Sequence, residues 1–252
     1  MQKVLIVSGC SFTFEEWNWP GHLGEMLNLK VINVGMASQG NGLISRKLLY
    51  ALDKALLEYK PEEILVGVMW SGTDRADFHS FDRKSVLDWG GFSEDTPGVK
   101  NPTSIVDDNF NWHIMNQHWE NRESKIYYSM FHTAVQGMLY SVEHILRVQW
   151  YLEKLNIPYF MSTFTSIFTE ILVENPEIEY LYKKIDFSSF LPIKGCYEWV
   201  LEHHKDDGGF NVPDNKQYLG IHPTSFGHQQ FAKKVIIPHL IEKQIIKHEK
   251  VI

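Results

Sequence analysis

The sequence predicts an α/β fold, a three-layer sandwich around a mostly parallel sheet of four or five strands. Short apolar, β-branched runs recur along the chain, longer amphipathic stretches separate them, and glycine or small polar residues end each run. This alternation favours a sheet that is covered by helices on both faces. The chain has 252 residues, of which 44% are hydrophobic and 22% charged, so it can bury a core of ordinary size.

The N-terminal part supplies three of the expected strands. Residues 3–7, 31–34 and 64–69 are short apolar runs of the kind that form buried parallel strands. Pro20 suits the first turn of a helix between the first two strands. Apolar residues at intervals of three and four over 41–59 predict a helix before the third strand.

The C-terminal part continues the alternation. Residues 124–155 carry the pattern of one long helix, and 157–164 are the fourth apolar run. A last helix is expected from about 224 to 237, with a threonine or serine as its cap and Pro238 breaking or kinking it.

Two stretches, about 76–122 and about 170–217, lack this periodicity, so we expect a single domain over 1–252 with two insertions. The first has the character of a surface excursion or a lid, and the second contains helical pieces. The first insertion also holds much of the aromatic excess, namely Trp89, Phe92, Phe110, Trp112 and Trp119. These rings are suited equally to stacking on a sugar and to forming a small core of their own.

Composition excludes several classes of protein. The net charge is −7, with 24 Lys and Arg against 31 Asp and Glu, which argues against a general nucleic-acid binder. Two cysteines make neither a disulfide framework nor a zinc site of their own. No signal peptide is recognisable, and no apolar stretch reaches the ~18 residues of a membrane span. We therefore expect a cytoplasmic protein without membrane partners.

Glycine-containing polar blocks stand where the predicted strands end. The first strand runs into 9–13 (Gly-Cys-Ser-Phe-Thr), the second into 33–41 and the third into 70–75, while 220–228 precedes the last helix. The carboxyl ends of parallel strands share one edge of the sheet, where ligands bind. Taken singly, such residues are more often caps or turn residues than functional groups.

The order and spacing of these blocks resemble the SGNH (GDSL-type) hydrolase superfamily. There a Gly-Asp-Ser block follows the first strand, a glycine block the second and a Gly-x-Asn-Asp block the third, and an Asp-x-x-His block precedes the last helix. The resemblance covers about 3–75, 125–165 and 218–240, and it implies a flavodoxin-like SGNH fold. It also implies that Ser11 is the nucleophile and His222 the base that takes its proton, as a serine hydroxyl requires.

The resemblance further implies an oxyanion hole of backbone N–H groups near Ser11 and at Ser38, or at Gly40 if the loop is longer. Asp74 stands where the family has its oxyanion asparagine. An ionised carboxylate cannot donate a hydrogen bond, so either Asp74 is protonated, or another group donates, or acyl transfer is impaired. Residues expected to bind substrate at the same edge are Gly40, Asn41, Trp70, Ser71 and Arg75, with Ser71 or Arg75 as the alternative donor.

Two further departures bear on activity. Cys10 replaces the usual aspartate of the first block. As a rival nucleophile it is disfavoured, since a cysteine at a strand end is usually buried and inert. Leu219 stands where an aspartate would orient His222, so the pair is expected to work as a dyad unless Asp214 or another acid reaches the imidazole.

These observations predict a serine esterase-type hydrolase that acts on an ester or O-acyl group of a small molecule or carbohydrate. A catalytically weakened module that binds a glycan or protein, and an O-acyltransferase, use the same residues and remain open, as does the oligomeric state. No cofactor and no metal is implied. The histidines at 113 and 118 and at 203 and 204 lack a recognisable ligand spacing, so we interpret them as solvated. His228 is expected to be a capping or surface residue.

Overall fold

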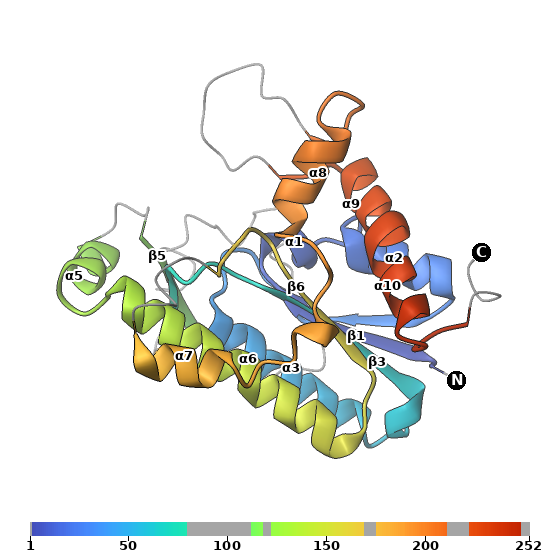
Figure 1. The fold of residues 1–252 in the computed structure, drawn as a ribbon, viewed down its shortest axis with the longest axis horizontal. Coiled ribbons are helices and arrows are strands. Elements are labelled where there is room, and N and C mark those ends of the chain that lie inside the picture. Colours follow the sequence, from blue (N-terminus) through green and yellow to red (C-terminus); the bar gives the residue numbers. More distant parts are fainter. Residues whose placement is uncertain (1, 80–111, 118–121, 169–174, 211–221, 248–252) are drawn as a thin grey trace.

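A sheet of four parallel strands in the order β2-β1-β3-β6 forms the centre of the molecule (Figure 1). The structure is a computed structural model that describes residues 2–79, 112–117, 122–168, 175–210 and 222–247. The strands are β1 (Val4–Gly9), β2 (Lys30–Asn33), β3 (Ile64–Trp70) and β6 (Tyr159–Thr163). The predicted α/β class is confirmed, and this strand order is the flavodoxin-like one. The strands are all parallel, and β2 is added on one side of β1 whereas β3 and β6 are added on the other.

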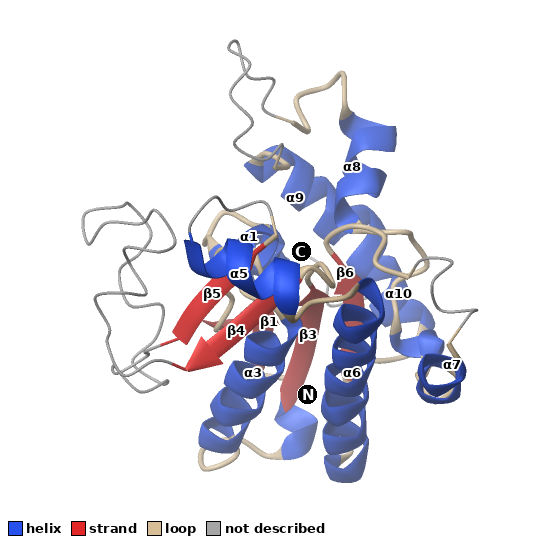
Figure 2. Cartoon of the chain, turned by 90° about the vertical axis from the view of Figure 1, so that its left-hand side faces the viewer, coloured by secondary structure: helices blue, strands red, loops and turns tan. Residues whose placement is uncertain are grey.

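Helices cover both faces of the sheet, as Figures 1 and 2 show. They are α1 (Ser11–Phe14), α2 (Trp19–Leu27), α3 (Asn41–Ala55), α5 (Arg122–Met130), α6 (Ala134–Leu155), α7 (Pro176–Tyr182), α8 (Cys196–His204), α9 (Ser225–Phe231) and α10 (Ile237–Glu242). Successive side chains of a strand point to opposite faces. Val4 and Ile6 therefore join the core under α3 and α6, whereas Leu5 and Val7 join the core under α2, α9 and α10.

The helix predicted over 41–59 is shorter than expected, because α3 ends at Ala55. Leu56 is the last residue of the apolar pattern, and Leu57 beyond it is exposed. A helix gains most of its stability from burying one face, so the helix ends where that face ends. The short 3₁₀ turn η1 (Pro61–Glu63) then leads into β3.

The stretch expected to be one long helix is two. α5 ends at Met130, and α6 begins after Thr133, whose hydroxyl accepts a hydrogen bond from the Gln136 N–H at 3.0 Å. This cap satisfies one of the N–H groups that a new helix leaves unpaired, so it fixes the second start. An apolar pattern that runs through both helices does not reveal such a break.

The last helix continues past Pro238, so the break that was one of the two expectations for this proline is wrong, and a local irregularity precedes it instead. A π-helical turn, η4 (Ala232–Ile236), connects α9 to α10, which continues to Glu242. Proline has no N–H to donate to the preceding turn, and its ring crowds the carbonyl there. Pro238 lies in the first turn of α10, directly after the π-helical turn, and there the missing donor costs little.

Both insertions contain regular structure. The first begins and ends with an antiparallel pair, β4 (Arg75–His79) and β5 (Trp112–Asn116), although no strand was predicted there. The second contains α7, the 3₁₀ turn η3 (Phe187–Ser189) and α8, in agreement with the helical pieces expected. Of the aromatic residues singled out in this insertion, Trp112 is the first residue of β5, and Trp89, Phe92, Phe110 and Trp119 lie outside the described residues.

Candidate functional site

Ser11 lies at the carboxyl edge of the sheet, at the start of the short helix α1 that follows β1. The turn is tight, since a Cβ at Gly9 would come within 3.0 Å of the Met69 carbonyl and would also overlap Thr13. The Ser11 carbonyl accepts a hydrogen bond of 2.8 Å from the buried Asn18 side chain. Glycine and this bond together fix the backbone that carries the serine.

The structure brings Ser11 and His222 together, 211 residues apart in sequence. The Ser11 Oγ lies 2.7 Å from the His222 Nε2, which is a hydrogen-bond distance. The imidazole packs against Phe12, with ring centroids 4.8 Å apart. A base within this distance of a serine hydroxyl can accept its proton. The expected aspartate position at Leu219 and the alternative acid Asp214 lie outside the described residues.

The loop after β2 lies beside Ser11. Ser38 in this loop has a φ of 64°, the left-handed region. Among the described residues, none accepts a hydrogen bond from the N–H of Ser11 or of Ser38. The N–H of Gly40, in contrast, donates to Asp77 Oδ1 at 2.9 Å. Gly40 therefore has no N–H to offer a substrate, and Ser38 is left as the candidate donor from this loop.

Three of the side chains expected to bind substrate are buried in the protein interior. The Asn41 amide donates to the Ser71 carbonyl at 3.1 Å and to Ser141 Oγ at 2.8 Å, and its oxygen accepts the Ser71 N–H at 2.8 Å. Asn41 thus joins the start of α3 to the end of β3. Trp70 is buried, with its indole N–H directed to Met161 Sδ. Ser71 is buried as well.

Asp74 and Arg75 follow β3 but form no ion pair with one another. The Asp74 carboxylate folds over Gly72, and the Asp74 carbonyl accepts the hydroxyl hydrogen of Tyr128. The Arg75 guanidinium lies over the Phe164 ring, 5.0 Å from its centroid. Arg75 therefore reaches across the end of β6 rather than neutralising its neighbour.

One exposed aromatic side chain lies near the site. Trp17, which is 46% exposed, lies with its ring centroid 6.2 Å from that of the buried His228, which is itself close to His222. Phe78 on β4 is exposed as well, but its ring contact is with Tyr127, edge to face at 5.1 Å.

His228 is buried, which contradicts the expected surface or capping role. Its side chain is 1% exposed, and burial, with His222 and His22 nearby, lowers its pKa to about 3. A second serine–histidine pair lies beside it, because His22 Nε2 is 3.0 Å from Ser225 Oγ. Sequence analysis missed this pair, since nothing in the pattern connects α2 to the start of α9.

The two cysteines are free thiols, and both are buried. Burial raises the pKa of the Cys196 thiol well above its ordinary value. Cys10 directly precedes Ser11 and packs in the core beneath α2 and α9. Its burial disfavours the alternative in which Cys10, and not Ser11, is the nucleophile.

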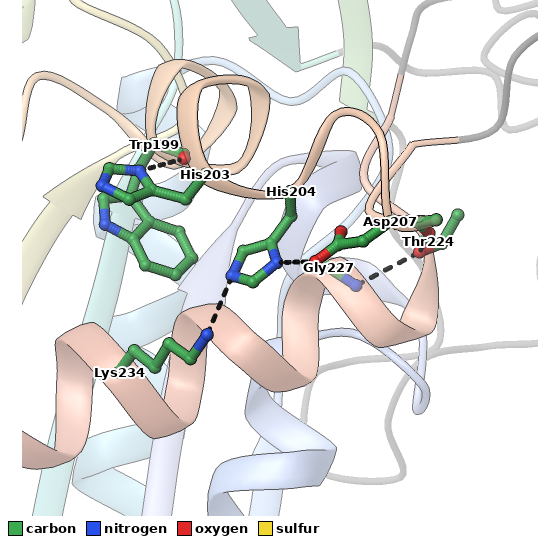
Figure 3. Close-up of polar contacts among 8 residues, drawn as sticks. Trp199, His203, His204, Asp207, Thr224, Gly227 and Lys234 are labelled. Carbon is green, nitrogen blue, oxygen red and sulfur yellow. Dashed lines mark hydrogen bonds and ion pairs between the residues drawn. The ribbon is translucent and has the colours of Figure 1, made fainter.

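The histidines at the end of α8 are held by protein partners (Figure 3). His204 Nδ1 lies 2.7 Å from Asp207 Oδ2, and its Nε2 lies 3.3 Å from Lys234 Nζ. A lysine ammonium can only donate, so Nε2 accepts and Nδ1 carries the hydrogen. His203 stacks on Trp199. In the described part of the chain, no three His, Cys, Asp or Glu side chains are grouped to hold a metal ion.

A cavity of about 820 Å³ is lined in part by Ser162 and Thr163 at the end of β6. Its walls come from the segment before α8 and from α8 and α10, and neither Ser11 nor His222 lines it. Among the described helices, none is both long and apolar enough to cross a bilayer.

Several solved structures are similar to this chain. A lipolytic protein of the G-D-S-L family from Desulfitobacterium hafniense DCB-2 is 13% identical, with a TM-score of 0.43 over 97% of this chain and all of that one. The acetyl xylan esterase AlAXEase is 12% identical, with a TM-score of 0.42 over 92% and 96% of the two chains. An acetyl xylan esterase from Butyrivibrio proteoclasticus is 15% identical, with a TM-score of 0.41, and this chain spans 64% of its length.

No curated protein matches the sequence significantly. A family model described as a family of unknown function, DUF6071, matches residues 8–250, which is nearly the whole chain. That match includes both insertions as well as the core of the fold and the Ser11 edge. The chain therefore belongs to the DUF6071 family.

Proposed function

We propose that the protein is a serine esterase-type hydrolase in which Ser11 attacks the ester carbonyl and His222 takes and returns the proton. The observation that carries this proposal is the 2.7 Å contact between the Ser11 hydroxyl and the His222 imidazole. The N–H groups of Ser11 and Ser38, which no described residue accepts, are the two donors that we assign to the oxyanion.

The reaction then follows the usual covalent course. The Ser11 oxygen bonds to the carbonyl carbon, its proton moves to His222 Nε2, and the alcohol leaves with that proton. Water next attacks the acyl-serine, with His222 again accepting a proton, and the acid is released. Transfer of the acyl group to a sugar hydroxyl instead of water needs no other residue.

A carbohydrate is the preferred alcohol portion. The exposed Trp17 ring lies near the site, 6.2 Å from the His228 ring, and flat aromatic faces stack on sugar rings. The expected product is thus a deacylated saccharide and a short carboxylic acid.

The test compares turnover of p-nitrophenyl acetate by the wild type, Ser11→Ala and Ser225→Ala. Ser225 is the matched control, because its hydroxyl also lies on a histidine nitrogen. We expect Ser11→Ala to lose at least about 10²-fold in rate and Ser225→Ala to keep the wild-type rate. A fluorophosphonate, read by intact mass, should label the wild type and not Ser11→Ala. Equal turnover by the wild type and Ser11→Ala would remove Ser11 from the mechanism.

The substrate class is tested on the active protein. Acetylated xylan should release acetate faster in the presence of the wild type than of Ser11→Ala. The variant Trp17→Ala should lower this rate more than it lowers turnover of p-nitrophenyl acetate. An equal effect on both substrates would argue against stacking of a sugar on Trp17.

A further inference from the structure

The loop that carries Ser38 is attached to the backbone in front of the nucleophile. The Gly9 carbonyl accepts two hydrogen bonds from this loop, one from the Met36 N–H at 3.1 Å and one from the Gln39 side-chain amide at 2.5 Å. The left-handed conformation of Ser38 lies between these two contacts. The first half of the loop is thereby tied to the strand that presents Ser11.

The second half of the loop is held by Asp77, a residue of the first insertion. Asp77 Oδ1 accepts the Gly40 N–H at 2.9 Å, and Oδ2 accepts the Leu43 N–H at 3.0 Å. The carboxylate is 7% exposed. A side chain at position 40 would place its Cβ 2.8 Å from Asp77 Oδ2, so the approach requires glycine there.

This arrangement differs from an ordinary helix cap. The residue before α3 is Gly40, which has no side chain to accept the first N–H groups of the helix. The acceptor comes instead from β4, a strand outside the part of the chain that resembles the SGNH core. Burial of the Asp77 carboxylate raises its pKa, whereas the two N–H bonds and the nearby Arg46 and Lys47 act in the opposite direction.

We propose that Asp77 is a positioning residue that fixes the Ser38 N–H as an oxyanion donor. It acts through Gly40: holding that N–H sets the direction of the peptide chain that leaves Ser38. This inference rests on the proposed esterase function and extends it, because it makes the first insertion part of the catalytic apparatus. A donor that is displaced by a fraction of an ångström loses much of its effect on a transition state.

The test is Asp77→Asn, which keeps the size of the side chain and replaces one acceptor oxygen by an NH₂ group. We expect kcat for p-nitrophenyl acetate to fall on the order of 10-fold to 10²-fold, with KM nearly unchanged. The rate of phosphonylation of Ser11 should fall in parallel.

The matched control is Asn175→Ala. Asn175 caps α7, away from Ser11, and likewise accepts two N–H groups, those of Glu177 and Ile178. Its removal should lower stability with no change in kcat. If both variants lower kcat in proportion to their loss of stability, Asp77 is only a helix cap and the proposal is overturned.

A second measurement does not depend on activity or on the variant folding. Hydrogen exchange in the wild type should be slow at the amides of Gly40 and Leu43, although first-turn amides usually exchange fast. Fast exchange at both would overturn the positioning role, even if the enzyme is active. If the wild type turns over no ester, the function proposal fails on its own, and slow exchange would still uphold Asp77 as the residue that orders the loop.

Discussion

His222 and His204 both lie in segments that pack around α9, and each has a polar group on its Nε2, but the two groups differ. The Nε2 of His204 accepts from Lys234, and its Nδ1 donates to Asp207, so the imidazole joins α8 to the following helices. The Nε2 of His222 meets the hydroxyl of Ser11. A serine hydroxyl that loses its proton to a histidine becomes a nucleophile, which is the role proposed for Ser11, whereas the Lys234 ammonium only donates a hydrogen bond to His204.

The largest expected effect separates the two histidines by activity. His222→Asn should lower esterase kcat by about 10²–10⁴-fold, the usual contribution of a general base. His204→Asn should keep most of the activity, because it touches neither Ser11 nor the loop at Ser38. Initial rates at equal folded concentration measure the difference. If kcat fell by a similar factor in both variants, the contact with Ser11 would not be the reason that His222 is needed for activity.

The next effect concerns a third histidine, His228, which is buried and has no acceptor or donor for its Nδ1 in the described structure. Its pKa of about 3 in the folded state lies below the ordinary value of 6.5. The unfolded chain therefore binds a proton that the folded one excludes, and stability falls as the pH drops below about 6.5.

His228→Leu should remove this dependence. Between pH 7.5 and pH 5, the wild type should lose about 2 kcal/mol of unfolding free energy through His228, and the variant should not. Urea unfolding at the two pH values measures it, with the exposed His203→Leu as control. An unchanged pH dependence in His228→Leu would mean that folding does not lower the pKa of His228.

A smaller effect tests the bond between His204 and Lys234. Lys234→Met leaves the buried His204 Nε2 without a partner and should cost about 1 kcal/mol of unfolding free energy. The adjacent Lys233 is exposed as well and has no such bond, so Lys233→Met is its control. Denaturation midpoints compare the two. If Lys234→Met and Lys233→Met are equally stable, the bond from Lys234 to His204 contributes nothing to the unfolding free energy.

The smallest expected effect concerns Asp74, which stands where the resemblance implies an oxyanion asparagine. In the position that the resemblance implies, Asp74→Asn would put an amide donor in place of a carboxylate beside the developing oxyanion, so kcat should rise a few-fold, less than the 10²–10³ of a well-placed donor. Rates from pH 5 to pH 9 measure it. A variant slower than the wild type at every pH would make Asp74 a working catalytic residue.

The four strands of the central sheet and its helical layers could be predicted from the sequence. Short β-branched runs that end at glycine or polar residues favour strands of a covered sheet, and parallel strands bring the segments that follow them to one edge. Chain order therefore indicated a serine after the first strand and a histidine before the last helix at the same edge. Their pairing as nucleophile and base was what the resemblance implied, and the two side chains lie within hydrogen-bond distance.

Which groups at that edge remain available depends on long-range packing, which the sequence pattern does not reveal. Gly40 and Asn41 lie at the expected edge, at the start of α3, but Asp77 and Ser71 take their hydrogen bonds. Asp77 lies on a strand that no pattern predicted, and His228 is buried by α2 packing on α9 rather than exposed on its helix. Most buried polar groups are paired, and the partner comes from whichever segment packs beside them, however far away it is in sequence.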